Sequence, residues 1–315
     1  MTHSRNALCL ALAAILGTTA AAHAAEPQHC HNVVFSDVGW SDITATTALT
    51  TTVLQALGYQ TETKVLSLPV TFTALSTDDV DVFLGNWMPT MEADIGPYRD
   101  AGTIDTVRVN LTGAKYTLAT NAAGAELGIA NFADIAQHKD ALDGRILGIE
   151  PGNDGNRLLL EMVAEDQFDL GTFEIVESSE QGMLAQVARA DRADKPVVFL
   201  GWEPHPMNSR FEVTYLQGGD DIFGPDLGGA EVMTNTRTGY VEECPNIGQF
   251  LQNLEFSLQM ENEMMGMILD DGQEPMAAAR DWLRANPDAA TPWLQDVTTV
   301  DGNDAQAALN EALAG

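Results

Sequence analysis

The sequence predicts an α/β protein of two lobes with a ligand-binding cleft between them. Short β-branched and aromatic runs alternate with helical patterns, which is typical of parallel βαβ units. One such set, residues 114–212, is inserted within a larger set formed by both ends of the chain. A chain of 315 residues can bury two cores. We therefore expect one lobe from residues 25–113 and 213–315, a second lobe from residues 114–212, and two strands that cross between them.

Residues 1–24 have the layout of a secretory signal peptide. Arg5 precedes an apolar run at 7–15, and small residues follow as far as Ala24, which is the order that such peptides share. The apolar run is too short to span a bilayer. We therefore expect cleavage after Ala24, loss of Cys9 with the peptide, and export of a soluble protein to the periplasm.

The first part of the mature chain alternates predicted strands and helices. The strand that matters most, VDVFLG, is expected to stop at Gly85, just before Trp87 and Pro89. The remaining elements are read from periodicity and from their glycine and proline boundaries. They are strands at 33–40 and 61–68, helices at 41–55 and 70–77, and two extended runs within 106–120 that join at 112–113.

The inserted set repeats this alternation. It contains a helical pattern at 126–142, a strand at 144–150, a loop at 151–156 that opens a helix, a strand at 173–179, a helix at 181–192 and a strand at 196–202. An extended run at 211–217 and a glycine-rich loop follow, and helices are expected to fill 245–315.

Three predicted strands end in a glycine that is followed closely by a tryptophan: Trp40, Trp87 and Trp202. Ligands of open α/β sheets bind beyond the carboxyl ends of the strands, so these rings are expected to face one another across the cleft. The alternative is that each ring packs only within its own lobe, as we expect for Trp282 and Trp293.

Several aromatic rings around one cleft suit a quaternary ammonium ion, which has no N–H to donate and is stabilised instead by ring quadrupoles. Each desolvated ring contributes about 2 kcal/mol. Tyr116 could supply a fourth ring, or it could belong to the core. Asp42 could accept a ligand hydroxyl or only cap a helix, and Asn153 could donate its amide. Sugars that stack on the same rings are the competing ligand class.

The charge of the chain excludes some partners. With 15 basic and 46 acidic residues, the formal net charge is −31, which disfavours nucleic acid and anionic membrane surfaces. Adaptation to a salty habitat explains such a surface without any ligand. The same field would also attract a cationic ligand, although charge alone does not establish one.

Two cysteines remain after removal of the signal peptide, Cys30 and Cys244. An even number in an oxidising compartment favours one disulfide, and two separate thiols are the alternative. A bridge would close a loop of more than 200 residues, worth about 4 to 5 kcal/mol in the chain-entropy model.

Signatures of catalysis are sparse. His205 has Glu203 nearby but no second histidine at helical spacing, so no metal site is expected. The sequence contains neither a GxSxG elbow nor an HExxH motif. We therefore expect no enzyme activity and no cofactor.

Seven segments resemble one known family: FSDVGWSDITATT, DVFLGNWMPTMEADI, GAKYTLATNA, GIEPGNDGNR, ESSEQGMLAQVARA, FLGWEPHPMN and SLQMENE. They are similar to the periplasmic substrate-binding proteins of ABC transporters for quaternary ammonium compounds, the glycine betaine and choline group. The resemblance is greatest to the choline binders of rhizobial type and covers essentially the whole mature chain.

The resemblance implies a type II periplasmic-binding-protein fold that closes over choline and delivers it, as a monomer, to the permease and ATPase subunits of an ABC importer. It also implies a disulfide between Cys30 and Cys244. Glycine betaine or trimethylamine oxide is the alternative ligand, and a secreted choline-ester hydrolase is the alternative class. The implied site consists of an aromatic box, Trp40, Trp87, Tyr116 and Trp202, and two hydroxyl anchors, Asp42 and Asn153.

Overall fold

The computed structural model describes residues 26–315, so the expected signal peptide lies outside the described residues. The described chain contains a nine-stranded sheet. Its strands are β1 (Asn32–Asp37), β2 (Gln60–Val65), β3 (Val82–Met88), β4 (Ile104–Thr120), β5 (Arg145–Leu147), β6 (Glu174–Val176), β7 (Val198–Glu203), β8 (Thr214–Tyr215) and β9 (Gly229–Arg237).

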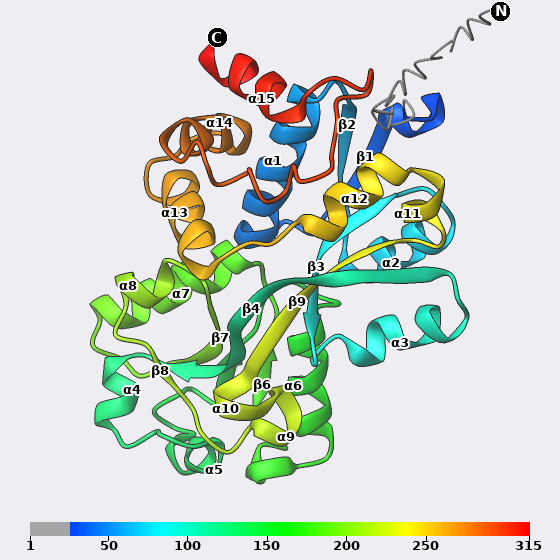
Figure 1. The fold of residues 1–315 in the computed structure, drawn as a ribbon. Helices are drawn as coiled ribbons and strands as arrows, with labels where there is room; N and C mark the ends of the chain where they lie inside the picture. Colours follow the sequence, from blue (N-terminus) through cyan, green and yellow to red (C-terminus); the bar gives the residue numbers. More distant parts are fainter. Residues whose placement is uncertain (1–25) are drawn as a thin grey trace, which may run out of the picture.

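Helices pack around the two ends of this sheet (Figure 1). The longer ones are α1 (Ser41–Ala56), α2 (Leu68–Ser76), α3 (Glu92–Asp100), α6 (Asp154–Ala164), α7 (Glu180–Arg192), α12 (Pro245–Asn253), α13 (Leu258–Leu269), α14 (Pro275–Ala285) and α15 (Ala305–Ala314). The shorter ones are α4 (Ala122–Glu126), α5 (Phe132–Ile135), α8 (Met207–Arg210), α9 (Asp220–Phe223), α10 (Pro225–Gly228) and α11 (Tyr240–Glu243), with 3-10 turns η1 (Gln28–His31), η2 (Ala136–His138) and η3 (Gln167–Asp169). Within residues 26–315, no helix combines the length and the apolar character needed to cross a membrane.

The strand order confirms the predicted α/β class with two lobes. The sheet runs β2-β1-β3-β9-β4-β7-β5-β6, and β8 pairs with β4. β1 is parallel to β2 and β3, while β5 is parallel to β6 and β7. β4 and β9 are antiparallel to each other and run together between these two parallel sets (Figure 1). The lobes are therefore joined by two strands that are also hydrogen-bonded neighbours.

Helix α1 has the bounds that the sequence predicts, although it is rich in threonine. All of its threonines except Thr44 are buried. The hydroxyls of Thr46, Thr50 and Thr51 donate to the backbone carbonyls four residues earlier, at 2.7 to 3.0 Å. Because these local bonds satisfy the hydroxyls, the helix can be buried against the sheet and helices α13 and α14.

The strand that was expected to stop at Gly85 continues beyond it. β3 runs through Trp87 to Met88 and has an irregularity between Phe83 and Asn86. A Cβ at Gly85 would lie 2.7 Å from the side chain of Ile43, so glycine is needed there for close packing with α1 and not to end the strand. The prediction of a strand end at Gly85 was therefore wrong.

Other predicted elements differ in extent. Residues 106–120 are not two runs but part of a single strand, β4, with bulges near Gly113. The helix expected at 126–142 is divided into short pieces, and the helical tail is interrupted by turns at 286–304. β9 lies where only a glycine-rich loop and no strand was predicted.

A disulfide joins Cys30 and Cys244, with the Cα atoms 5.6 Å apart and a sequence separation of 214. Both cysteines are buried. The bridge ties η1, which precedes β1, to the start of α12. The alternative of two separate thiols is therefore excluded.

Loss of this disulfide is expected to lower the free energy of unfolding by about 4 to 5 kcal/mol, because the unfolded chain regains the entropy of a long loop. Urea unfolding with and without a reductant measures the difference. The paired variant Cys30→Ser and Cys244→Ser should have the lower stability under both conditions. A reductant effect in that variant would show that the loss does not come from the disulfide.

Candidate functional site

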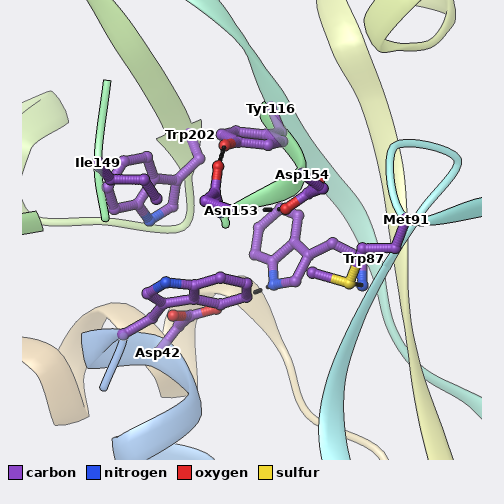
Figure 2. Close-up of a pocket in the computed structure, with 9 residues that line it drawn as sticks. Asp42, Trp87, Met91, Tyr116, Ile149, Asn153, Asp154 and Trp202 are labelled. Atoms are coloured by element: carbon purple, nitrogen blue, oxygen red, sulfur yellow. Dashed lines mark hydrogen bonds between the residues drawn. The ribbon is translucent and has the colours of Figure 1, made fainter. Parts of the chain in front are cut away.

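A small cavity lies where the carboxyl ends of β1, β3 and β7 approach the start of α6. About 290 Å³ of space is not filled by atoms there, a volume that includes space open to solvent. Figure 2 shows side chains from both lobes that point into it. The lining residues are Trp40, Asp42, Trp87, Met91, Tyr116, Ile149, Asn153, Asp154 and Trp202.

Strands carry three of the four aromatic side chains of the cavity. Tyr116 and Trp202 are direct partners across β4 and β7, and their ring centroids are 6.3 Å apart at an interplanar angle of 78°. Trp87, near the end of β3, meets Tyr116 at 6.1 Å. Trp40 immediately precedes α1. All four are at most 6% exposed, so the rings form a desolvated box.

Asp42 lies at the base of the box and is 2% exposed. Its Oδ2 accepts a hydrogen bond from Trp87 Nε1 at 3.1 Å. Among residues 26–315, no donor contacts its Oδ1. The N-cap residue of α1 is Trp40, so the alternative of Asp42 as helix cap is wrong. Asp42 thus offers a free acceptor next to the aromatic rings.

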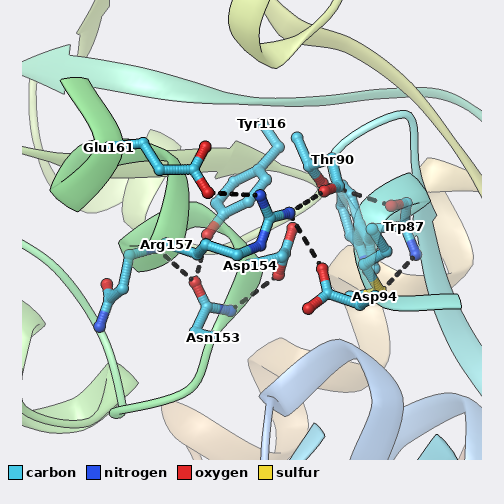
Figure 3. Close-up of polar contacts among 10 residues, drawn as sticks. Trp87, Thr90, Asp94, Tyr116, Asn153, Asp154, Arg157 and Glu161 are labelled. Carbon is cyan, nitrogen blue, oxygen red and sulfur yellow. Dashed lines mark hydrogen bonds and ion pairs between the residues drawn. The ribbon is translucent and has the colours of Figure 1, made fainter. Parts of the chain in front are cut away.

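Asn153 is the N-cap of α6 and is held by its neighbours on three sides (Figure 3). Its Oδ1 accepts from the Tyr116 hydroxyl at 2.9 Å and from the Asn156 backbone N–H at 3.1 Å. Its Nδ2 donates to Asp154 Oδ1 at 3.0 Å. One amide hydrogen of Asn153 is left for a ligand.

Buried acidic groups give the cavity its electrostatic character. Burial, together with the nearby Glu180 carboxylate, raises the pKa of Asp42 to about 7. Burial also raises the pKa of Asp154 to about 7, and Asp94 adds to the effect. The pKa of Glu261 is raised well above its usual value by burial and by Asp42. None of the nine lining residues of the described chain is basic, so a cation would relieve this crowding of acids.

Gly155 sets the position of the Tyr116 ring. A Cβ at Gly155 would lie 2.0 Å from the Tyr116 hydroxyl oxygen and 2.6 Å from the ring carbon that bears it. Only glycine allows the first turn of α6 to approach the ring this closely. The depth of the cavity on this side therefore depends on a residue that does not line it.

The structure brings together all six residues predicted for the site, and their contact with a ligand stays a prediction. Trp282 and Trp293 lie in the core away from the cavity, as expected. Sequence reasoning missed Met91, Ile149 and Asp154. Asp154 lies in the loop predicted at 151–156, next to the predicted Asn153. Asn156 stabilises the start of this loop, because its side chain bonds to the backbone of Ile149 and Glu150. All three missed residues line the cavity.

Two lobes joined by paired strands, with an aromatic cavity between them, define a binding protein for a small ligand. A family comparison specifies the class further: residues 31–285 match the substrate binding domain of ABC-type glycine betaine transport systems. The chain belongs to this family.

Several relatives are similar over much of the chain. Two solved structures of an ABC-transporter choline binding protein are 66% identical to it and cover 91% of this chain and 100% of their own. The TM-score is 0.90 for the complex with choline and 0.85 for the unliganded semi-closed conformation. The uncharacterized protein ORF1 of Chromohalobacter salexigens is 46% identical over 129 residues, which are 41% of this chain and 83% of that protein.

The raised pKa of Asp42 predicts an unusual pH dependence of stability. The folded state holds the Asp42 proton more tightly than the unfolded state does, so stability is lost as the pH rises toward about 7. Asp42→Asn should therefore be more stable than the parent at neutral pH. The free energy of unfolding of Asp42→Asn relative to that of the parent should grow by at most ~2 to 3 kcal/mol between about pH 5 and about pH 8.

Urea unfolding at both pH values measures this difference. The exposed Asp221 provides a control, since Asp221→Asn should leave the pH profile unchanged. If the difference in free energy of unfolding between Asp42→Asn and the parent were the same at both pH values, the raised pKa of Asp42 would be contradicted.

Proposed function

We propose that this protein captures choline in the periplasm and presents it, in the closed form, to the permease and ATPase subunits of an ABC importer. The observation that carries the proposal is the desolvated box of Trp40, Trp87, Tyr116 and Trp202 beside the free Oδ1 of Asp42. The binding of choline by a structural relative that is 66% identical supports the same ligand.

The trimethylammonium group would occupy the aromatic box. Four desolvated rings contribute a gross ~8 kcal/mol, the scale of a micromolar dissociation constant before binding costs are subtracted. The ligand hydroxyl would donate to Asp42 Oδ1 and accept from the free amide hydrogen of Asn153. These two polar contacts would offset part of the cost of ordering the ligand.

The acidic surroundings favour choline over glycine betaine. The carboxylate of betaine would lie beside Asp42 and Asp154, both buried, and like charges repel strongly in a dry cavity. Trimethylamine oxide has no hydroxyl hydrogen to donate to Asp42. Choline alone among the three combines a cationic head with a hydroxyl donor.

We propose binding without chemical conversion. The nine described residues around the cavity include no serine, cysteine or histidine, so a serine- or cysteine-based hydrolysis of choline esters has no nucleophile there. We also propose that a monomer is sufficient for binding.

We propose that the lobes divide as expected at 113/114, within β4, and that ligand binding closes them. The chain returns from the second lobe to the first at a second boundary. We propose that this boundary lies in β9 and not at the expected 212/213. β8 pairs with Ala119 and Thr120 of β4, and α9 and α10 lie with the elements of the second lobe in Figure 1. The lobe interface therefore follows the β4 and β9 pair.

Trp87→Ala should weaken choline binding about 30-fold, because one desolvated cation–π contact of ~2 kcal/mol is lost. Titration calorimetry measures the dissociation constant. Trp87→Phe, which keeps a ring face, should be intermediate, and Trp282→Phe, far from the cavity, should bind as the parent does. No binding of choline by the parent, or unchanged binding by Trp87→Ala, would sink the proposal.

Competition between ligands tests the role of Asp42. In the parent, glycine betaine should displace choline only at a concentration ~100-fold higher or more, equivalent to about 3 kcal/mol of repulsion. Asp42→Asn should reduce this ratio of affinities for choline and glycine betaine, because it weakens choline binding and removes one like charge near betaine. Equal affinities for both ligands in the parent would instead favour a general binder of methylated amines.

A further inference from the structure

We propose that Glu180 is the residue that holds the two lobes closed and thereby positions Trp40 and Asp42 on the ligand. Glu180 belongs to α7 in the second lobe, and it bonds to Ser41, the first residue of α1 in the first lobe. Ser41 lies between two residues that line the cavity. The inference deepens the proposed function and rests on it only for the choice of ligand.

The contact uses both oxygens of one carboxylate. Glu180 Oε2 accepts from the Ser41 backbone N–H at 2.9 Å, and Glu180 Oε1 accepts from the Ser41 hydroxyl. Ser41 is 4% exposed and Glu180 is 1% exposed. Hydrogen bonds to a buried carboxylate are stronger than those between neutral groups, so this contact links the lobes more firmly than an exposed ion pair would.

The N-terminus of α1 explains why the contact matters. Helix N-termini carry backbone N–H groups without partners in the helix. In the described chain, the N-cap Trp40 makes no side-chain hydrogen bond to α1. Glu180 supplies the missing acceptor from the other lobe, and its negative charge complements the dipole of the helix. The Ser41 backbone N–H therefore has this acceptor only when the lobes are closed.

His205 holds the carboxylate of Glu180 in place. The Met207 backbone N–H donates to His205 Nδ1 at 2.9 Å, so a neutral ring carries its hydrogen on Nε2. That nitrogen lies 3.2 Å from Glu180 Oε1. The His205 ring also packs on Trp202, with centroids 5.0 Å apart. The same group of residues thus touches the aromatic box from both lobes.

A hydrolytic triad is the competing interpretation of Ser41, Glu180 and His205. In such a triad, the histidine contacts the serine and the acid orients the histidine. Here the Ser41 hydroxyl donates to the acid, and His205 Nε2 is directed to that same acid. These contacts fit a structural link between the lobes. His205 is not placed to accept the proton of the Ser41 hydroxyl, as a catalytic base would.

A second contact between the lobes serves as a matched control. Arg210 of α8 pairs with Asp270, which follows α13. Their side chains are 35% and 50% exposed, and exposed ion pairs contribute little to stability. The two contacts therefore differ in burial, and also in donor, since Asp270 accepts from a guanidinium and Glu180 from a backbone N–H and a hydroxyl.

Glu180→Gln tests the inference, because it keeps the size of the side chain but places one amide group against the donors of Ser41 and His205. Stopped-flow fluorescence with choline should show dissociation 10- to 100-fold faster and association within about threefold of the parent. Asp270→Asn should change neither rate more than about twofold. Ser41→Ala, which keeps the backbone donor, should show a smaller acceleration of dissociation and provides a second variant if Glu180→Gln fails to fold.

A measurement without ligand separates this inference from the proposed function. Small-angle scattering of the ligand-free proteins should give a larger radius of gyration for Glu180→Gln than for the parent and for Asp270→Asn. If the parent does not bind choline, the proposed function fails, and the scattering comparison still decides whether Glu180 holds the lobes together. Unchanged scattering together with a dissociation rate like that of the parent would overturn the inference, as would equal effects of Glu180→Gln and Asp270→Asn.

Discussion

The burial of carboxylates beside an aromatic cavity is the constraint on which the rest of this structure depends. A buried charge is tolerated only if hydrogen-bond donors surround it. Trp87 supplies a donor to Asp42 within the first lobe, while Trp40 donates to Glu150 in the second lobe at 2.8 Å. The indole N–H groups of Trp40 and Trp87 are thus bonded to acids at the edges of the cavity, so the flat faces of these two rings are what remains for a ligand.

Other contacts of this arrangement cross between the lobes. On its outer side, Arg157 of α6 bonds to the backbone carbonyl of Thr90 at 2.9 Å and to Asp94 at 3.0 Å (Figure 3). These contacts join the lobes through side chains, whereas β4 and β9 are paired over most of the length of β9. The backbone connection between the lobes is thus a two-stranded ribbon, and the proposed closure would change side-chain contacts around it.

Local patterns account for the parts of the fold and site that the sequence predicts. The β-branched runs before Trp87 and Trp202 specify buried strands, and the strands place the rings at one edge of the sheet. β9 was missed because its sequence, GAEVMTNTR, has no clear alternation. Glu180 was missed for a different reason: its partner Ser41 is 139 residues away, and a contact over that distance leaves no periodicity in the sequence.

Gly155 is a position at which evolution could change the shape of this cavity. A Cβ at this position would lie 2.0 Å from the Tyr116 hydroxyl oxygen, so any larger side chain would displace the ring. Selection could therefore alter which molecules fit by changing a position outside the wall of the cavity. The four rings and Asp42 would all be retained, and two proteins with identical lining residues could then differ in their ligands.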